Sequence, residues 1–333
     1  NPDFFSITKK FHNALHGKGL HLSKIKKQIY EKTNRDFSVF THVNHDAVFI
    51  HDPQPLPLIN FYKKRQPWIW RCHIDLSAPN QDLWNYLKRF ILRYDMIIIS
   101  SENYRIENFP VPQKVITPTI DPISPKNKAL SQRDISKYMK KYHIPDDKPI
   151  ITQISRFDRL KDPLGVIKVF KKVKKKIDCR LVLCGSFAAD DPEGFSIYKQ
   201  VLKNANAFIE KNDIIVLNVE NDILVNLLQK ISKVIIQKSL KEGFGLTVTE
   251  ALWKGTPVVA SNVGGIPLQI DDGENGYLVN PFDYDGFAER IIHILDNPSL
   301  AERIGNKARQ TVKEKFLITR SLIDYIDLLN EMI

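Results

Sequence analysis

The sequence contains little cysteine and no long apolar run. Its 333 residues include only three cysteines, Cys72, Cys179 and Cys184, and none of them has the spacing of a metal site. A small, odd number of cysteines within apolar stretches is typical of buried thiols in a reducing cytoplasm and argues against a disulfide-stapled secreted domain. No stretch of about 18 apolar residues occurs, so we expect neither a membrane-spanning helix nor a membrane partner.

The N-terminal residues lack two further features. They do not show the basic, apolar and small-residue succession of a secretory signal, which together with the cysteine usage predicts a cytoplasmic protein. The chain begins at Asn1 rather than at a methionine, from which we expect that residues upstream are missing.

Positive charge, in contrast, is in excess. The 49 Lys and Arg residues against 38 Asp and Glu give a formal net charge of +11. Much of it lies in the segment 168–176, which belongs to a predicted helix with Val166, Phe170 and Val173 on its apolar face and its lysines facing solvent. These lysines are not interleaved with aromatic residues and no RNA or DNA signature is present, so we expect no nucleic-acid partner. Attraction of an anionic small substrate is at least as consistent with this charge.

Apolar runs typical of buried strands alternate with helical segments in two series. Continuous apolar strands joined by helices indicate parallel sheets that are covered on both faces. The sequence therefore predicts an α/β protein with two doubly wound, Rossmann-like domains that face each other across a cleft. The predicted strands lie in the segments 47–52, 67–75, 96–100, 114–120, 149–155, 179–185, 213–218, 233–239, 256–261 and 276–279.

Polar residues follow many of these strands. Ligands of doubly wound sheets bind beyond the carboxyl ends of the strands, so these positions are candidates for a site. They are His51 and Asp52, the segment 71–75, Arg156, Gly185, the segment 239–245, and Gly264 with Gly265.

The stretch 239–261 carries two glutamates, Glu242 and Glu250, around the glycines Gly243 and Gly245. Glycines let the backbone approach a ligand closely, and a helix N-terminus behind them presents free N–H groups. Such a turn suits an anion or a hydroxylated sugar. A structural interpretation stands beside it, since Thr247 and Glu250 have the spacing of a capping box and Glu242 can be a surface carboxylate.

The stretch 155–167 carries two cations in the turn between a strand and a helix. Asp162 is predicted to cap that helix, with Pro163 at its first position. Arg156 and Lys161 then lie in the turn, where arginine offers a bidentate fork and lysine a point charge to a pyrophosphate. Either cation alone would suggest only a solvated surface residue.

These residues resemble a known family. Arg156 and Lys161 followed by EGFGLTVTE (242–250), together with the segment 260–279, are similar to the donor site of retaining nucleotide-sugar glycosyltransferases of family 4, which have the GT-B fold. The resemblance implies that Arg156 and Lys161 hold the leaving phosphates, that Glu242 binds sugar hydroxyls and that Glu250 binds the ribose. It also implies donor contacts from Gly243, Phe244, Gly245 and Leu246.

The first half of the chain resembles one subgroup of that family. The segments 4–17, 51–62, 67–80 and 116–127 are similar to glycosyltransferring trehalose synthases, which are related to retaining trehalose phosphorylases. The resemblance implies that the first domain binds the acceptor sugar through Asp52, Gln54, His73 and Asp75. Two structural alternatives stay open, because HDPQP is also a good turn and a histidine in an apolar run is often a core residue.

The resemblance also implies a domain division. We expect an acceptor-binding domain at 1–145, a donor-binding domain at 146–317 and a C-terminal helix at 318–333 that packs back on the first domain. The family opens with a strand and a glycine-rich loop, and neither precedes Asn1. We therefore expect the first domain to be partial, either as a fragment of a longer protein or by a natural loss that would affect catalysis.

The activity implied is reversible transfer of an α-glucosyl group, with retention, from a nucleoside diphosphate glucose to glucose, giving trehalose. The predicted catalytic residues are Arg156, Lys161, Glu242 and His73, with His73 orienting the sugars. The alternatives are a trehalose phosphorylase that uses glucose 1-phosphate and a catalytically silent sugar-nucleotide-binding protein. The sequence leaves the donor base open and is compatible with a homodimer.

No metal site and no tightly bound cofactor are expected. The segment 283–285 reads Asp-Tyr-Asp, like the Asp-x-Asp of metal-dependent transferases. It precedes a predicted helix, so Asp283 is expected to cap that helix instead. A Mg²⁺ ion can still accompany the nucleotide.

Overall fold

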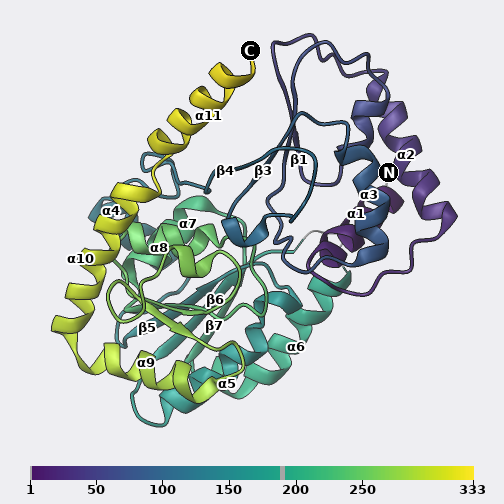
Figure 1. Cartoon of the computed structure of the whole chain (residues 1–333). Helices are drawn as coiled ribbons and strands as arrows, with labels where there is room; N and C mark the ends of the chain where they lie inside the picture. The colour runs from purple at the N-terminus through teal and green to yellow at the C-terminus, as the bar shows by residue number, and fades with distance from the viewer. Residues whose placement is uncertain (1, 188–191) are drawn as a thin grey trace. The chain divides into compact units, whose positions relative to one another are not determined.

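The computed structural model describes residues 2–187 and 192–333, and it divides into two compact units (Figure 1). Unit 1 consists of Asn1–Pro118 and Ser321–Ile333, and unit 2 of Thr119–Arg320. Both are built on parallel sheets with helices, as predicted for an α/β protein. Among the described residues, nine of the ten apolar runs predicted as strands contain a strand of the two sheets, and the tenth, 114–120, overlaps a strand that begins one residue earlier, at Gln113. Among the described residues, no helix is long and apolar enough to cross a membrane.

The sheet of unit 1 follows chain order. Its strands β1 (Val48–His51), β2 (Trp68–Arg71), β3 (Met96–Ile99) and β4 (Gln113–Val115) are all parallel and lie in the order β1-β2-β3-β4. This is the order of one half of a doubly wound sheet. The helices of this unit are α1 (Pro2–Leu15), α2 (Lys24–Ser38), α3 (Gln81–Ile91) and α11 (Ile318–Met332), with 3₁₀ turns η1 (Leu56–Asn60) and η2 (Glu102–Tyr104).

Alternating strand residues bury the two faces of this sheet. Trp68 and Trp70 of β2 point into the cluster that includes helices α1 to α3. Ile69, between them, packs on the other face with Leu328 of α11. The C-terminal helix therefore packs on the sheet of unit 1, because successive strand residues face opposite sides and each side needs an apolar cover.

Unit 2 has a sheet of strand order β10-β9-β8-β5-β6-β7. The order runs outward in both directions from the central pair β5 and β8, which makes this a doubly wound sheet with its switch point between those two strands. The strands are β5 (Ile150–Ile154), β6 (Arg180–Gly185), β7 (Ile214–Asn218), β8 (Val234–Gln237), β9 (Val258–Ser261) and β10 (Tyr277–Val279).

Helices cover both faces of this second sheet. Figure 1 shows α5, α6 and α9 on one side of it and α7 and α8 on the other. Buried residues of α5, α6 and α9 share a cluster with the sheet, and those of α7 and α8 fill two further clusters. The helices are α4 (Gln132–Lys141), α5 (Pro163–Lys174), α6 (Pro192–Ile209), α7 (Asp222–Ile231), α8 (Leu246–Trp253), α9 (Tyr284–Asp296) and α10 (Pro298–Lys315), with 3₁₀ turns η3 (Arg159–Lys161) and η4 (Ile266–Leu268).

The segment between the two sheets packs with unit 2. The N–H of Ile120 donates to the carbonyl of Phe316 at 2.9 Å, and Ile120 in turn accepts from Ile318 at 2.9 Å. Apolar residues of α4 such as Ile135 and Met139 lie against the cluster of β5 and α7. For this reason the unit boundary falls at Pro118, earlier than the expected 145.

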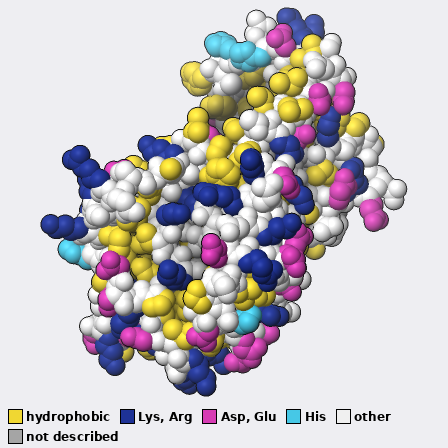
Figure 2. All heavy atoms as spheres, turned by 90° about the vertical axis from the view of Figure 1, so that its left-hand side faces the viewer, with side chains coloured by type: hydrophobic (Ala, Val, Ile, Leu, Met, Phe, Trp, Pro, Cys, Tyr) yellow, Lys and Arg dark blue, Asp and Glu magenta, His cyan; other side chains and the backbone are white. Residues whose placement is uncertain are grey.

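Several local predictions hold. Val166, Phe170 and Val173 are the buried face of α5, with lysines on its other side. Cys72, Cys179 and Cys184 are all buried and free, as predicted for core thiols. Figure 2 shows the side on which Figure 1 places α4 and α10 of unit 2, and many Lys and Arg side chains are exposed on it.

Candidate active site

Two loops meet at the switch point of unit 2. One follows β5 and spans residues 155–162, and the other follows β8 and spans residues 238–245. The N–H of Leu240 donates to the carbonyl of Leu160 at 2.7 Å and ties the loops together. Since ligands of doubly wound sheets bind at this point, the loops form the candidate donor site.

Lys161 and Glu242, predicted from the two loops separately, form an ion pair. The Nζ of Lys161 lies 2.5 Å from Oε2 of Glu242, and only 18% and 11% of the two side chains are exposed. The same oxygen accepts hydrogen bonds from Ser239 Oγ at 3.2 Å and Gln237 Nε2 at 3.3 Å.

These contacts set the charge of Glu242. Burial alone would raise the pKa of this carboxyl, but the charge and hydrogen bond of Lys161, with hydrogen bonds from Ser239 and Gln237, lower the pKa below its usual value. Glu242 is therefore ionised at neutral pH. An ammonium has three N–H donors, so Lys161 can hold Glu242 and still donate to a phosphate oxygen.

A second ion pair fixes the backbone beside Lys161. Asp162 caps α5 as predicted, its Oδ1 accepting from the N–H of Gly165 at 3.0 Å, with Pro163 as the first helical residue. The other oxygen of Asp162 pairs with Lys238, whose side chain is fully buried. Sequence analysis missed Lys238, because a lysine at the end of an apolar run is most simply interpreted as a surface residue.

Arg156 lies on the same loop but apart from the Lys161–Glu242 pair. Its side chain is 61% exposed, and it forms an ion pair with Asp158 at 3.8 Å. Asp158 itself caps η3 through the N–H of Leu160 at 2.7 Å. The structure thus leaves the guanidinium at the solvent-facing rim of the loop.

The glycine turn after β8 begins α8 without a side-chain cap. Gly245 is the N-cap residue, with φ of +87°, a region that favours glycine. The predicted capping box of Thr247 and Glu250 is wrong, because the positive φ lets the helix start at Leu246 and places Thr247 inside the first turn. No side chain of the described residues caps this helix start, so its first N–H groups can face a ligand or solvent.

The turn packs closely against the loop after β9. A Cβ atom added to Gly265 would lie 2.7 Å from the carbonyl oxygen of Gly243. The carbonyl of Phe244 accepts from Gln269 Nε2 at 2.6 Å, and the ring of Phe244 is buried. Leu246 is 42% exposed. Packing against Gly265 and the hydrogen bond from Gln269 therefore fix the backbone of 243–245.

Glu250 lies inside the unit. It is buried on α8, and its Oε2 accepts from Gln229 Nε2 at 3.1 Å. Burial raises the pKa of this carboxyl, against the opposing effects of Lys126, the Gln229 hydrogen bond and Lys254. Glu250 makes no hydrogen bond to the Lys161–Glu242 pair in the part of the chain that the structure describes.

In unit 1, Asp52 and His73 come together after β1 and β2. The Oδ1 of Asp52 accepts from the backbone N–H of His73 at 2.8 Å, and Asp52 has φ of +60°. Burial raises the pKa of Asp52, while the hydrogen bond from His73 and nearby positive groups oppose that rise.

His51 joins this group, although sequence analysis noted it only as a polar residue after a strand. Its Nδ1 lies 2.9 Å from His73 Nε2, and the rings stack with centroids 5.3 Å apart. Desolvation, then the charges of Arg71 and His51, lower the pKa of His73 to about 4. The parallel pairing of β1 with β2 could have suggested this grouping. It places His51 beside Arg71, and His73 follows Arg71 by two residues.

The other two predicted acceptor residues have local partners. Asp75 is buried, and its Oδ1 accepts from the N–H of Ser77 at 2.9 Å. The carbonyl of Gln54 accepts from Asn34 Nδ2 at 3.1 Å. Asp75 thus shapes the turn after β2, and Gln54 holds the loop after β1 to α2.

The Asp-Tyr-Asp stretch has structural partners. Asp283 caps α9 as predicted, its Oδ1 accepting from Gly286 at 2.8 Å. Asp285 pairs with Lys172 at 2.6 Å. Within residues 2–187 and 192–333, no group of three or more His, Cys, Asp or Glu residues could hold a metal ion.

Comparison with known proteins agrees with this arrangement. Residues 1–106 match the family described as "Trehalose synthase, N-terminal domain", and residues 134–311 match "Glycosyl transferases group 1". The structure is similar to a UDP-forming α,α-trehalose-phosphate synthase from Burkholderia xenovorans, with a TM-score of 0.79 and 16% identity over 100% of this chain and 86% of that one. The fold is therefore GT-B, the class of two-domain glycosyltransferases.

Two curated relatives identify the family within this class of glycosyltransferases. The chain is 45% identical to the trehalose synthase of Thermococcus litoralis, over 98% of this chain and 80% of that protein. It is 29% identical to the trehalose phosphorylase of Pleurotus pulmonarius, over 95% of this chain and 49% of that protein. The chain belongs to the trehalose synthase family of group 1 glycosyltransferases.

Proposed function

We propose that the protein transfers an α-glucosyl group, with retention, from a nucleoside diphosphate glucose to glucose, giving trehalose in a reversible reaction. The observation that carries this proposal is the Lys161–Glu242 pair at the switch point of unit 2. A cation and an ionised carboxylate held side by side match the two parts of a sugar diphosphate, since one attracts phosphate and the other accepts from sugar hydroxyls.

The donor would lie across the loops after β5 and β8. Lys161 would contact the diphosphate, and the exposed Arg156 is free to swing onto it from the loop rim. The N-terminus of α8 would add partial positive charge. Glu242 would accept from the glucose hydroxyls and Glu250 from the ribose, with the backbone of 243–246 around them.

The mechanism proposed is the one that the family resemblance implies. The bond between the glucose C1 and the phosphate oxygen breaks, and a bond from an acceptor hydroxyl oxygen forms on the same face. The hydroxyl proton passes to the leaving phosphate oxygen, so no protein base is needed. Lys161 and Arg156 would stabilise the negative charge as it develops on the diphosphate.

The acceptor glucose would bind at the unit 1 residues that the resemblance selects, Asp52, Gln54, His73 and Asp75. His73 has a pKa of about 4, so it is neutral at pH 7 and can both accept and donate a hydrogen bond. Its contact with His51 fixes the orientation of the ring. In this proposal His73 positions the sugar rather than taking its proton.

A trehalose phosphorylase is the second candidate, favoured by the similarity to the Pleurotus enzyme. Glucose 1-phosphate has no ribose, so Glu250 would then have no donor group to bind. We further propose that the protein works in the cytoplasm without a tightly bound cofactor, with Mg²⁺ accompanying the nucleotide, and that it can form a homodimer.

The test is a product assay with matched variants. The protein is incubated with glucose and UDP-, ADP- or GDP-glucose, or with glucose 1-phosphate, and trehalose, nucleotide and phosphate are measured together. The proposal predicts equal amounts of trehalose and nucleoside diphosphate, with activity reduced at least about 100-fold by Lys161→Ala. Lys172→Ala, a surface lysine in another ion pair, is the control and should keep activity.

Two results would reject this function. Trehalose and phosphate from glucose 1-phosphate, with nothing from the nucleotide donors, would identify a phosphorylase. Absence of product from every donor, in a protein that still binds nucleoside diphosphate glucose, would identify a silent homologue.

A further inference from the structure

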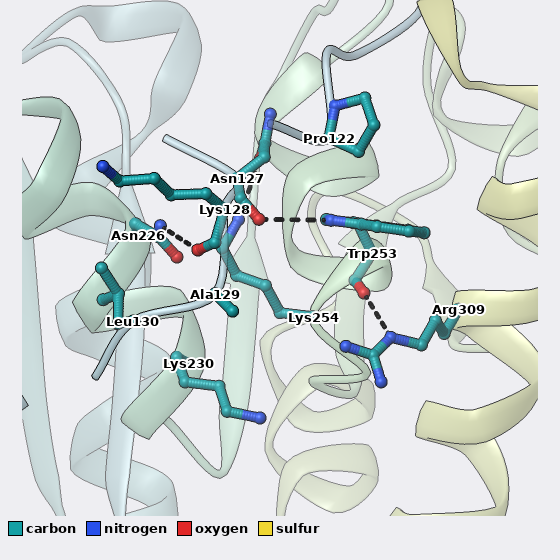
Figure 3. Close-up of a pocket in the computed structure, with 10 residues that line it drawn as sticks. All are labelled: Pro122, Asn127, Lys128, Ala129, Leu130, Asn226, Lys230, Trp253, Lys254 and Arg309. Atoms are coloured by element: carbon teal, nitrogen blue, oxygen red, sulfur yellow. Dashed lines mark hydrogen bonds between the residues drawn. The ribbon is translucent and has the colours of Figure 1, made fainter. Parts of the chain in front are cut away.

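Unit 2 contains a pocket to which none of the candidate donor residues contributes. It has a volume of about 210 Å³ and lies between the segment 122–130 and the helices α7, α8 and α10. Figure 3 shows its lining residues. The segment crosses the groove between the helices and is held there by Asn226, whose Nδ2 donates to the carbonyls of Pro125 at 3.0 Å and Lys128 at 2.8 Å.

The pocket lining is cationic. Lys128, Lys230, Lys254 and Arg309 contribute to it, and no Asp or Glu side chain does. None of these four cations forms an ion pair with a carboxylate of the described residues. Four like charges around one small cavity repel one another, so a bound anion would lower the electrostatic energy of this region.

Lys254 forms the buried part of the lining. Only 8% of the residue is exposed, and its Nζ donates to Asn127 Oδ1 at 2.9 Å and to the carbonyl of Glu250 at 3.2 Å. Burial lowers the pKa of this ammonium, and the charge of Glu250 only partly opposes the effect. The hydrogen-bond partners of its ammonium are neutral oxygens, and the carboxylate of Glu250 offsets its charge only in part.

Trp253 supplies an apolar surface with a fixed position. Its Nε1 donates to the carbonyl of Asn127 at 3.3 Å, and its own carbonyl accepts from Arg309 Nε at 3.1 Å. The guanidinium carbon of Arg309 lies 5.6 Å from the centre of the indole ring. In Figure 3 the guanidinium of Arg309 lies below the indole of Trp253, and the side chain of Lys230 extends toward the side on which Arg309 lies.

We propose that this pocket binds a small phosphate-bearing anion at a site separate from the donor loops. Arg309 and Lys230 would contact the phosphate oxygens, one as a fork and the other as a point charge. Lys254 would attract the anion from within, and Trp253 would cover a carbon-containing part of the ligand. The volume fits a phosphate with a small organic group, because drug-sized ligands need about 300 Å³ or more.

Tryptophan fluorescence gives a direct test. The other three tryptophans, Trp68, Trp70 and Trp84, are buried in unit 1, so the difference between the wild type and Trp253→Phe isolates the signal of the pocket. Inorganic phosphate is titrated at low ionic strength, with chloride at equal ionic strength as the control. The proposal predicts a saturable change with phosphate that chloride does not produce.

Variants locate the binding. Lys230→Gln with Arg309→Gln should weaken phosphate binding at least about tenfold, since two charge-assisted contacts are lost. Both side chains are exposed, so the fold should survive, which a thermal melt checks. Lys161→Ala should leave the Trp253 signal unchanged, because Lys161 lies in the donor loop. This control separates failure of the new site from failure of the donor site.

A comparison of the affinities of two ligands identifies the source of the phosphate. Glucose 6-phosphate binding tighter than inorganic phosphate would assign the site to organic phosphates, and equal affinity would assign it to the free ion. The proposal is overturned if phosphate leaves the Trp253 signal unchanged, if Lys161→Ala abolishes the change, or if glucose without phosphate binds equally well.

Discussion

The ammonium of Lys161 lies 2.5 Å from the carboxylate of Glu242, although 81 residues separate them in the chain. The two side chains come from loops after β5 and β8, the strands between which the strand order of unit 2 reverses. The contact therefore depends on the whole sheet being assembled. It also explains how a largely buried glutamate remains ionised.

We expect Lys161 and Glu242 to contribute to the free energy of unfolding as a coupled pair. Lys161→Met leaves Glu242 with an uncompensated charge and should destabilise unit 2 by roughly 3 kcal/mol, while Lys161→Met with Glu242→Gln should recover part of that loss. Urea unfolding of the wild type, Lys161→Met, Glu242→Gln and the double variant measures the coupling. Strictly additive losses would contradict the pairing.

The same pair predicts a pH dependence. Because the pKa of Glu242 is lowered on folding from its ordinary 4.5, its stabilisation is present above that pH and is lost as the pH falls through the folded value. Glu242→Gln should flatten the corresponding part of the stability curve below pH 4.5. An unchanged curve in this variant would show that other carboxyls dominate.

Asp162 should matter more for stability than an ordinary helix cap. Asp162→Ala removes the cap of α5 and also leaves the fully buried Lys238 without its carboxylate, so a loss of about 3 kcal/mol or more is expected. Asp283→Ala is the matched control, because Asp283 caps α9 without a buried lysine and should cost only about 1 kcal/mol. Equal losses in urea unfolding would refute the role of Lys238.

Much of the fold could be predicted from sequence, because buried parallel strands give continuous apolar runs and their carboxyl ends are polar. The Lys161–Glu242 contact could not, since β5 and β8 are not consecutive and local patterns do not encode strand order. The capping box predicted at Thr247 and Glu250 is wrong for a local reason. Gly245 adopts a left-handed conformation that starts α8 earlier than the capping motif suggests.

His73 should not titrate in the neutral range. Desolvation, Arg71 and His51 lower its pKa to about 4 from an ordinary 6.5. As the pH falls, the unfolded state therefore binds the proton at a higher pH than the folded state does. This residue therefore lowers stability as the pH falls from 6.5 towards 4. NMR titration of the imidazole should show its midpoint well below 6, and His51→Ala should move the midpoint upward. A midpoint near 6.5 in the wild type would disprove the arrangement.

Gly265 should be needed for the shape of the donor turn. Gly265→Ala places a Cβ 2.7 Å from the Gly243 carbonyl, which the backbone of the turn can relieve only by moving. We expect donor KM to rise at least about tenfold, as the proposed N–H contacts are misplaced. Gly19→Ala is the control, because a Cβ there meets no atom within 4 Å. Unchanged donor KM in Gly265→Ala would exclude the turn from donor binding.

The most direct test of the central claim is calorimetric binding of a nucleoside diphosphate and of the matching nucleoside diphosphate glucose to wild type, Lys161→Ala and Glu242→Gln. If Lys161 holds the diphosphate and Glu242 the sugar hydroxyls, Lys161→Ala weakens both ligands, whereas Glu242→Gln weakens only the glucose-bearing one, each by about tenfold or more. Equal affinities across the three proteins would contradict the assignment of the donor site to this pair.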